Sequence, residues 1–285
     1  MGFLVGGARC ATTTTAYTLA EHPDIYLPDV KEPTFFGNTY DYGCPSFKEY
    51  KNLYNKTDSN VLLDCSTAYL HIDNVPREIS KKITNPYIII HLRDPIERAK
   101  SQYRLQVRNK NENLSFKGAI DKEEERKNKG SSQTYHYTTK SFYYKEVQGF
   151  LSEFENVRIV LFENFVDEPM KVIRDHAKFL SADPQMLPGD TVDSNAGNEP
   201  LVPIINDLLV KEFPFRKNIA ELFPWSFRRW LVMRIRSLNL SDKKKKLDID
   251  SDISKNLVDM YSEDVKKLNN IIEQPLEEIW PRYFN

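Results

Sequence analysis

The chain has 285 residues, of which 40% are hydrophobic and 28% charged, and its formal net charge is −1. This length supports one sizeable core without requiring two independent domains. A nucleic-acid-binding or membrane-surface protein would show a strong basic excess, which is absent here. Any basic site must therefore be local.

The chain contains three cysteines, Cys10, Cys44 and Cys65, at irregular spacing. They form neither a disulfide framework nor a metal-ligand pattern, so we expect a reducing compartment and no metal. The apolar runs at 3–5 and 230–235 are too short for a signal peptide or a membrane span. These features predict a cytoplasmic protein with no transmembrane segment, and they leave its oligomeric state open.

Buried strands and helices alternate along the first part of the chain. Runs of Val, Ile and Leu without alternation predict strands near residue 4 and at 61–64, 87–92 and 157–162. Helical patterns follow or precede them at 12–21, 75–83, 95–108, 143–154 and 169–180, with Asp94 and Pro95 as start signals for the third helix. The expected fold is α/β, a three-layer α/β/α sandwich with a central parallel sheet.

Residues 200–285 differ in character, being helix-rich, interrupted by prolines and without a convincing strand. We predict one domain over 1–285, made of an α/β nucleotide-binding core (1–199) and a helical C-terminal extension of it (200–285). The lysine-rich run 242–252 is expected to be a solvated loop. The polar stretch 121–133 is expected to be a surface helix end and loop, and a mobile substrate lid is the alternative.

Residues 3–15, FLVGGARCATTTT, predict a strand–loop–helix cradle that binds a phosphate-bearing nucleotide. Small residues let successive N–H groups converge on an anion at the positive end of a helix. Thr12, Thr13 and Thr14 add hydroxyl donors, and Arg9 adds a full charge. The alternative is an ordinary glycine-rich turn with a threonine cap.

The loop departs from the P-loop pattern G-x-x-x-x-G-K-[ST] of nucleotide-hydrolysing proteins. Gly6 begins that register, but Ala11 replaces the second glycine and Thr12 replaces the lysine. The cation has moved to Arg9, inside the loop. This P-loop-like cradle is poorly equipped to transfer a γ-phosphoryl group and better suited to a nucleotide with a smaller or less charged terminal group.

A second anion site is predicted after the third strand, in YIIIHLRDPIERAKSQYRLQ. Arg93 ends that strand, and Ser101 lies on the helix that follows. Guanidinium binds phosphate in a bidentate way, and ligands of open parallel sheets lie beyond the carboxyl ends of the strands. The alternative for Arg93 is an ion pair with Asp94 or Glu97. Together the two sites fit 3′-phosphoadenosine 5′-phosphosulfate (PAPS).

At this point the sequence resembles the PAPS-dependent sulfotransferase family, including its bacterial and carbohydrate-modifying members. GARCATT is similar to the 5′-phosphosulfate motif, and HLRDPIERAKSQY is similar to the 3′-phosphate motif R-D-P-x-x-R-x-x-S-x-Y. The segments HPDIYLPDVKEPTFF, RIVLFENFVDEPMKVIRDHAKFL and YSEDVKKLNNIIEQPLEEIW resemble three further stretches in the family's order.

The chain departs from the family pattern at two positions. Ala11 occupies the usual glycine position, and we expect the turn to keep a negative φ there. In DCSTAYL, which looks like the family's E-K-T-P-x-Y, Cys65 replaces the lysine. A basic contact near the acceptor is therefore absent or supplied from elsewhere.

The resemblance implies in-line transfer of a sulfuryl group from PAPS to a hydroxyl or amine, most favourably on a carbohydrate or glycolipid, without a metal. Glu32 in KEPTFF matches the catalytic base, and an exposed ion pair with Lys31 is its alternative role. His71 and His91 are other possible bases, although His91 is expected to pack in the core. The resemblance also implies a set of donor-binding residues: Arg9, Cys10, Ala11, Thr12, Thr13, Thr14, Arg93 and Ser101. Arg9 is further implied to stabilise the leaving adenosine 3′,5′-bisphosphate (3′,5′-ADP).

Two competing functions stay open on the sequence. The first is a nucleotide-dependent phosphotransferase of the wider P-loop class, which the missing lysine disfavours. The second is a non-catalytic nucleotide-binding protein of the same fold, which Glu32 and the two anion motifs disfavour.

Overall fold

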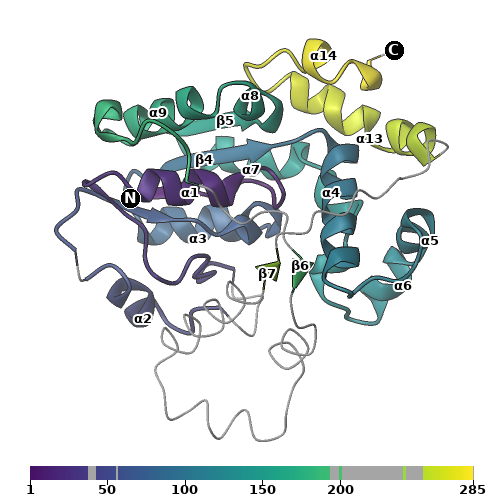
Figure 1. Cartoon of the computed structure of the whole chain (residues 1–285), viewed down its shortest axis with the longest axis horizontal. Coiled ribbons are helices and arrows are strands. Elements are labelled where there is room, and N and C mark those ends of the chain that lie inside the picture. Colours follow the sequence, from purple (N-terminus) through teal and green to yellow (C-terminus); the bar gives the residue numbers. More distant parts are fainter. Residues whose placement is uncertain (38–42, 56, 193–198, 201–239, 242–252, 285) are drawn as a thin grey trace, which may run out of the picture.

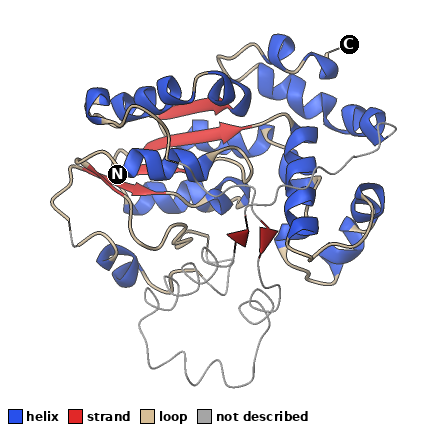
Figure 2. Ribbon diagram, in the orientation of Figure 1, coloured by secondary structure: helices blue, strands red, loops and turns tan. Residues whose placement is uncertain are grey.

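The computed structural model describes residues 1–37, 43–55, 57–192, 199–200, 240–241 and 253–284. Five parallel strands form the central sheet in the order β2-β3-β1-β4-β5. They are β1 (Gly2–Leu4), β2 (Ile25–Tyr26), β3 (Val61–Asp64), β4 (Tyr87–Leu92) and β5 (Val157–Leu161). Helices cover both faces of this sheet, so the predicted α/β/α sandwich is confirmed (Figure 2).

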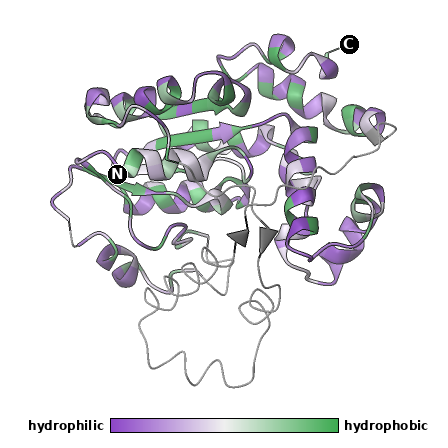
Figure 3. Cartoon of the chain, viewed as in Figure 1, coloured by the Kyte–Doolittle hydropathy of each residue, from purple (hydrophilic) through white to green (hydrophobic). Residues whose placement is uncertain are grey.

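Alternate residues of the strands face two separate hydrophobic clusters. In β4, Ile88 and Ile90 join one cluster, whereas Ile89 joins the other. Because successive side chains point to opposite faces of a sheet, a strand that is apolar at every position must be covered twice. Figure 3 shows this contrast, with hydrophobic colours along β4 and β5 and hydrophilic colours on outlying α6 (Glu123–Asn128).

Different helices cover the two faces of the sheet. One face carries α1 (Thr12–Ala20) and α9 (Pro169–Phe179), and the other carries α3 (Val75–Lys82) and α7 (Tyr144–Glu153) (Figure 1). The long helix α4 (Pro95–Arg108) follows β4, with α5 (Phe116–Asp121) and α6 beside it (Figure 1). Short elements complete this part: α2 (Phe47–Asn52), α8 (Phe162–Asp167), and the 3-10 helices η1 (Thr67–His71), η2 (Gln133–Tyr135), η3 (Thr139–Ser141) and η4 (Pro184–Met186).

The C-terminal residues pack on the α/β core. Helix α13 (Ile253–Asn269) is followed by α14 (Leu276–Ile279) and η5 (Pro281–Tyr283). Tyr261 donates to the carbonyl of Thr138 at 3.1 Å, and Asp264 accepts the N–H of Tyr143 at 2.8 Å. None of the helices in the described part of the chain has the length and apolar character that a bilayer crossing needs.

One expectation about the C-terminal part was wrong. Residues 200–285 were predicted to lack strands, but β7 (Leu240–Ser241) pairs antiparallel with β6 (Glu199–Pro200). Two-residue strands leave no periodicity to detect in a sequence. The apolar segment 230–235 and the lysine-rich run 242–252 lie outside the described residues.

Candidate functional site

The two predicted anion loops lie side by side at the carboxyl edge of the sheet. β1 pairs directly with β4, and the strand order reverses there, since β3 lies on the other side of β1. Such a reversal is where open α/β sheets bind their ligands. Beyond the strands, the N–H of Gly7 donates to the carbonyl of His91 at 2.8 Å. A side chain at Gly6 would come within 2.1 Å of the His91 nitrogen, so only glycine allows this approach.

The backbone of the first loop is left-handed at two non-glycine residues, Arg9 (φ 76°) and Ala11 (φ 63°). The prediction of a negative φ at Ala11 was therefore wrong. The loop must turn sharply to enter α1, and the tertiary contacts of the loop maintain a conformation that alanine disfavours. Ala11 is the N-cap of α1 and offers no side-chain cap. The first N–H groups of the helix consequently need another acceptor.

Arg9, Arg93 and Ser101 come together in the structure. Nε of Arg9 donates to Oγ of Ser101 at 3.1 Å, and Arg93 donates to the carbonyl of Arg9 at 3.2 Å. The guanidinium of Arg93 also lies over the ring of Phe162, 4.1 Å from its centroid. These contacts join two segments that are more than eighty residues apart.

The alternative ion pairs of Arg93 are not formed. Asp94 pairs with Arg282 at 3.4 Å, and Glu97 pairs with Lys100 at 3.1 Å. Asp94 also caps α4, accepting the N–H of Glu97 at 3.0 Å, as predicted from its position before Pro95. Among the described residues, no Asp or Glu forms an ion pair with Arg9 or Arg93.

Positive charge accumulates around the loop. Burial lowers the pKa of Arg9 to about 10, and the like charges of Arg108 and Arg93 add to the effect. Arg98 is also buried, and it donates to neutral acceptors, Oγ of Ser141 at 2.6 Å and the carbonyl of Tyr137. Buried cations that lack a carboxylate partner in the described residues are stabilised by an anionic ligand.

Arg108 was not singled out from the sequence. It lies seven residues after Ser101 on α4, two turns along the same face, and its charge acts on Arg9. That spacing could have identified it. The other motif residues have structural contacts: Arg98 holds the 137–141 segment, and the hydroxyl of Tyr103 donates to the carbonyl of Leu114 at 2.9 Å.

The remaining loop residues predicted to bind the donor differ in exposure. Thr12 is buried, whereas Thr13 and Thr14 are half-buried. Cys10 is fully buried, its thiol lies 3.8 Å from the carbonyl of Ala8, and burial raises its pKa to about 12. The thiol of Cys10 faces the protein, so this residue offers only its backbone to the loop surface.

Glu32 lies in a strained segment beside η1. Its φ is 60° and that of Thr34 is 47°, both in the left-handed region. One carboxylate oxygen of Glu32 accepts from Lys31 at 2.8 Å, and the other accepts from Thr67 at 3.3 Å. The ion pair with Lys31 is formed, but it is not an exposed one, since the side chain of Lys31 is only 7% exposed.

A buried carboxylate, Asp64, anchors the segment that carries Glu32. Asp64 accepts hydrogen bonds from Ser66 at 2.6 Å and Tyr69 at 3.1 Å. Those two hydroxyls in turn accept the N–H groups of Thr34 at 3.1 Å and Phe35 at 2.9 Å. Burial raises the pKa of Asp64 to about 6, although these hydroxyls oppose the shift. No local sequence pattern predicts this support.

A cation lies beside Cys65, at the position where the resemblance led us to expect a lysine. Burial acts to lower the pKa of Lys31, but the neighbouring Cys65 and Glu32 outweigh it and the pKa is raised. Lys31 and Cys65 come from different loops, so their proximity was not readable from spacing. The basic group near Cys65 is thus supplied by Lys31.

Lys140 lies near Glu32, and His71 lies near Lys140. Burial and the charge of Arg98 lower the pKa of Lys140 to about 8, while Glu32 acts in the opposite direction. Burial, with Lys140 and Arg98, lowers the pKa of His71 well below 6.5. His91 is fully buried in β4, as predicted. Among the described residues, no three or more His, Cys, Asp or Glu come together as a metal-binding group.

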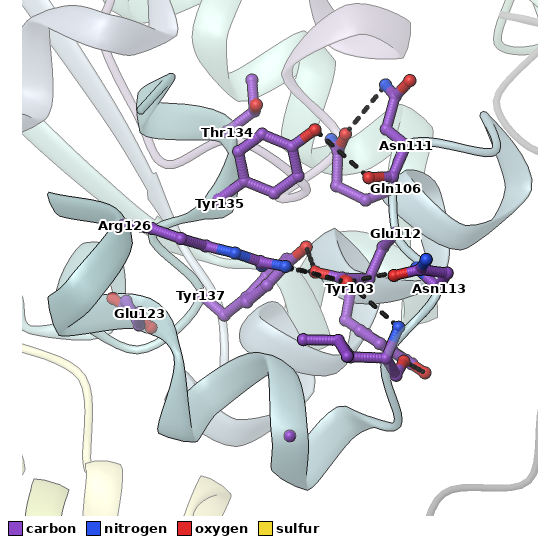
Figure 4. A network of polar contacts seen from close by, with 12 residues as sticks. Tyr103, Gln106, Asn111, Glu112, Asn113, Glu123, Arg126, Thr134, Tyr135 and Tyr137 are labelled. Atoms are coloured by element: carbon purple, nitrogen blue, oxygen red, sulfur yellow. Dashed lines mark hydrogen bonds and ion pairs between the residues drawn. The ribbon is translucent and has the colours of Figure 1, made fainter. Parts of the chain in front are cut away.

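The stretch 121–133 is held to the body by a polar network (Figure 4). Arg126 of α6 pairs with the buried carboxylate of Glu112 at 2.5 Å and lies over the ring of Tyr135. Glu123 accepts four hydrogen bonds, from the N–H and hydroxyl groups of Thr138 and Thr139, at 2.7 to 2.9 Å. This arrangement agrees with the interpretation of 121–133 as a surface helix end and loop. The contacts of Glu123 also hold Thr138 and Thr139, which directly precede Lys140.

No family model matches the chain. The chain is 29% identical over 118 residues to a protein of Dictyostelium discoideum, the membrane-associated sulfotransferase kil1. That match covers 40% of this chain and only 25% of the relative. The chain thus spans about a quarter of the length of this curated relative.

Solved structures give a broader match. The crystal structure of a sulfotransferase from Alicyclobacillus acidocaldarius superposes with a TM-score of 0.64 at 27% identity, covering 82% of this chain and 95% of that one. A mouse sulfotransferase, SULT7A1 complexed with PAP, matches at a TM-score of 0.39 and 14% identity, covering 90% of this chain and 88% of that one. In its five-stranded fold, its motif order and the bacterial match, this chain is similar to sulfotransferases.

Proposed function

We propose that the protein transfers the sulfuryl group of PAPS to a hydroxyl or amine, most favourably on a carbohydrate or glycolipid. One observation carries the proposal: Arg9, Ser101 and Arg93 are joined by hydrogen bonds at the strand-order reversal, and the described residues provide no carboxylate for the two arginines. A donor with phosphate groups at both its 5′ and 3′ positions supplies the missing negative charge at two points.

The donor-binding roles follow from the two loops. The N–H groups of Ala11 to Thr13, at the uncapped start of α1, face the 5′-phosphosulfate. Arg9 stabilises the charge that develops on the bridging oxygen as 3′,5′-ADP leaves. Its guanidinium stays protonated even with a pKa of about 10, so its help is electrostatic. Arg93 and Ser101 hold the 3′-phosphate and keep the donor in line.

Glu32 serves as the base that deprotonates the acceptor. Its carboxylate is fixed by Lys31 and Thr67, and Asp64 holds the surrounding segment through Ser66 and Tyr69. A base must be held within reach of the proton that it removes. The strained φ of Glu32 supports a functional role, because such strain concentrates at active sites.

We also propose where the protein works in the cell and how its domain is organised. We infer that residues 1–285 act as a single sulfotransferase domain and that the protein works in the cytoplasm. The three cysteines are free and buried, in keeping with a reducing compartment. Fractionation of cells that express a tagged full-length chain tests the location.

The test is a transfer assay with labelled PAPS against oligosaccharide, glycolipid, phenol and tyrosyl-peptide acceptors. We expect label on a sugar acceptor, and loss of most turnover in Glu32→Gln with unchanged 3′,5′-ADP affinity. The exposed Glu21→Gln is the matched control. Magnesium-dependent ATP turnover without PAPS activity would instead identify a phosphotransferase. Binding of 3′,5′-ADP with no transfer to any acceptor would identify a non-catalytic protein.

A further inference from the structure

Two buried histidines lie directly beneath the phosphate loop. His91 is in the middle of the sheet on β4, and His176 is on α9, which covers that face. Both are 0% exposed. Nδ1 of His91 lies 2.9 Å from the carbonyl oxygen of Cys10, and Nε2 of His91 lies 2.8 Å from Nε2 of His176. The two rings therefore form a chain that ends on the loop backbone.

The protons of this chain can be assigned. A carbonyl oxygen only accepts, so Nδ1 of His91 carries a proton and donates it to Cys10. Burial lowers the pKa of His91 to about 4, so the ring is neutral and Nε2 is an acceptor. Nε2 of His176 must then be the donor across the 2.8 Å contact. That leaves Nδ1 of His176 without a proton, and it is buried with no partner in the described residues.

This arrangement controls the direction of a peptide group. The peptide bond is planar and trans, so its C=O and N–H point in opposite directions. With the Cys10 carbonyl held down onto His91, the N–H of Ala11 in the same peptide points away from the core. Ala11 is the N-cap of α1, with φ of 63°. Its N–H therefore points to the side on which the first turn of α1 presents its backbone N–H groups.

We propose that His91 and His176 are positioning residues of the phosphate loop, which hold the Cys10 carbonyl inward so that the N–H of Ala11 faces the donor's 5′-phosphate. His176 acts by donating to Nε2 of His91, which anchors the imidazole ring on the side opposite the Cys10 carbonyl. If His176 cannot donate, Nε2 of His91 loses its partner and the ring is no longer held in one position. The hydrogen bond from Nδ1 to the Cys10 carbonyl then weakens, and the peptide loses its fixed orientation.

The inference rests on the proposed function for its ligand, but the tautomer can be measured without any ligand. In the full-length protein at pH 7, ¹⁵N chemical shifts should show a protonated Nδ1 and a bare Nε2 in His91, and the reverse in His176. The opposite tautomer of His91 would overturn the proposal. A wild-type protein that shows this tautomer but does not bind 3′,5′-ADP would refute the proposed function, and would overturn the role in donor binding with it.

Variants of His176 separate positioning from packing. His176→Phe keeps a ring but cannot donate, and it should bind 3′,5′-ADP about tenfold more weakly, the effect of one lost hydrogen bond. His176→Gln carries a side-chain N–H near the position of Nε2 and should restore most of that affinity. The control is Ile173→Val, a buried change one turn earlier on α9 that should lower stability but leave 3′,5′-ADP affinity unchanged.

Wild-type affinity in His176→Phe, with a fall in stability like that of Ile173→Val, would reduce the pair to core packing. Equal losses of affinity in His176→Phe and His176→Gln would also overturn the proposal, because donation by residue 176 would then be irrelevant.

Discussion

At the scale of single residues, the candidate site depends on how the protein holds the guanidinium of Arg93. Arg93 lies over Phe162 and donates to the backbone of Arg9, so its guanidinium is held in place before any ligand binds. Nε of Arg93 is buried and has no partner in the described part of the chain. A preorganised guanidinium loses little freedom when it binds a phosphate.

The first prediction concerns Arg93→Ala. It should weaken binding of 3′,5′-ADP by about a hundredfold, because a charge-assisted contact contributes about 1.5–3 kcal/mol. Binding of 5′-AMP, which lacks the 3′-phosphate, should change much less. Calorimetry with both ligands measures the difference, and Arg104→Ala on α4 is the control. Equal losses for the two ligands would refute the assignment of Arg93 to the 3′-phosphate.

The second prediction concerns the backbone at Ala11. Relief of a left-handed alanine is worth about 1–2 kcal/mol, and the added freedom of glycine in the unfolded chain removes about 0.4–1 kcal/mol of it. Ala11→Gly should therefore stabilise the fold by about 0.5–1 kcal/mol, measured by urea unfolding. Ala16→Gly, in the helical interior of the same α1, should instead destabilise it by about 1 kcal/mol or more. Destabilisation by both changes would argue against φ of 63° at Ala11.

At the scale of elements, η3 is fixed from two sides. Glu123 of α6 binds Thr138, just before η3, and Thr139, the first residue of η3, while Arg98 of α4 binds Ser141 at its end. Lys140 lies between these anchors. A buried carboxylate that accepts four hydrogen bonds has no substitute within reach, so its removal leaves four donors unsatisfied.

The third prediction is that Glu123→Gln lowers the free energy of unfolding by about 2 kcal/mol, since the amide can accept at only one of its two polar atoms. The same variant should raise the acceptor KM, because Lys140 loses its support, and leave 3′,5′-ADP affinity unchanged. The neighbouring Glu124→Gln, at an exposed position, is the control. Matching behaviour of the two variants would show that the Glu123 contacts contribute nothing.

Elements with a strong pattern were predictable, whereas those defined by tertiary contacts were not. β4 and α4 were predicted at their observed bounds, because an unbroken apolar run and an Asp–Pro start are local signals. β2 has two residues and pairs only with β3, so it carries no local signal. The same division holds in the site. Arg9, Arg93 and Ser101 could be chosen from motifs, but Asp64 acts through hydroxyls that only the fold brings together.

At the scale of the whole molecule, neutral buried histidines link stability to pH. The pKa of His91 is lowered to about 4 by burial, and those of His71 and His176 fall well below 6.5 for the same main reason. The charged neighbours add to this: Arg158 acts on His91 and His176, while Lys140 and Arg98 act on His71.

The fourth prediction follows from the sign of these shifts. Above pH 6.5 the histidines are neutral in both states and add no pH dependence. Below pH 6.5 the histidines of the unfolded chain take up protons, whereas the buried histidines of the folded chain stay neutral. The free energy of unfolding therefore falls as the pH drops from 6.5 towards 4. His91 alone accounts for roughly 3 kcal/mol over that window. Urea unfolding at several pH values should show this slope, and His176→Gln should reduce it. A flat profile between pH 6.5 and 4.5 would contradict burial of neutral histidines.

The C-terminal element η5 contacts the residue that follows Arg93. The hydroxyl of Tyr283 donates to Asp94 at 3.2 Å, and Nε of Arg282 lies 3.4 Å from the other oxygen of that carboxylate. Asp94 directly follows Arg93 and caps α4. The C-terminal elements thus support the start of the helix that carries Ser101, in keeping with one domain over 1–285.

The fifth prediction tests that coupling. Tyr283→Phe removes one hydrogen bond to Asp94 and should lower the free energy of unfolding by about 1 kcal/mol. If α13 to η5 fold with the core, calorimetry should show one transition, and it should move as a whole to lower temperature. Binding of 3′,5′-ADP should slow amide hydrogen exchange in 276–283 as well as in α1, because a ligand that binds only the native state protects every part that unfolds with it. Protection confined to residues 1–192, or a separate low-temperature transition, would mean that the C-terminal elements unfold independently. The Asp94 contacts would then be a docking interface between two units.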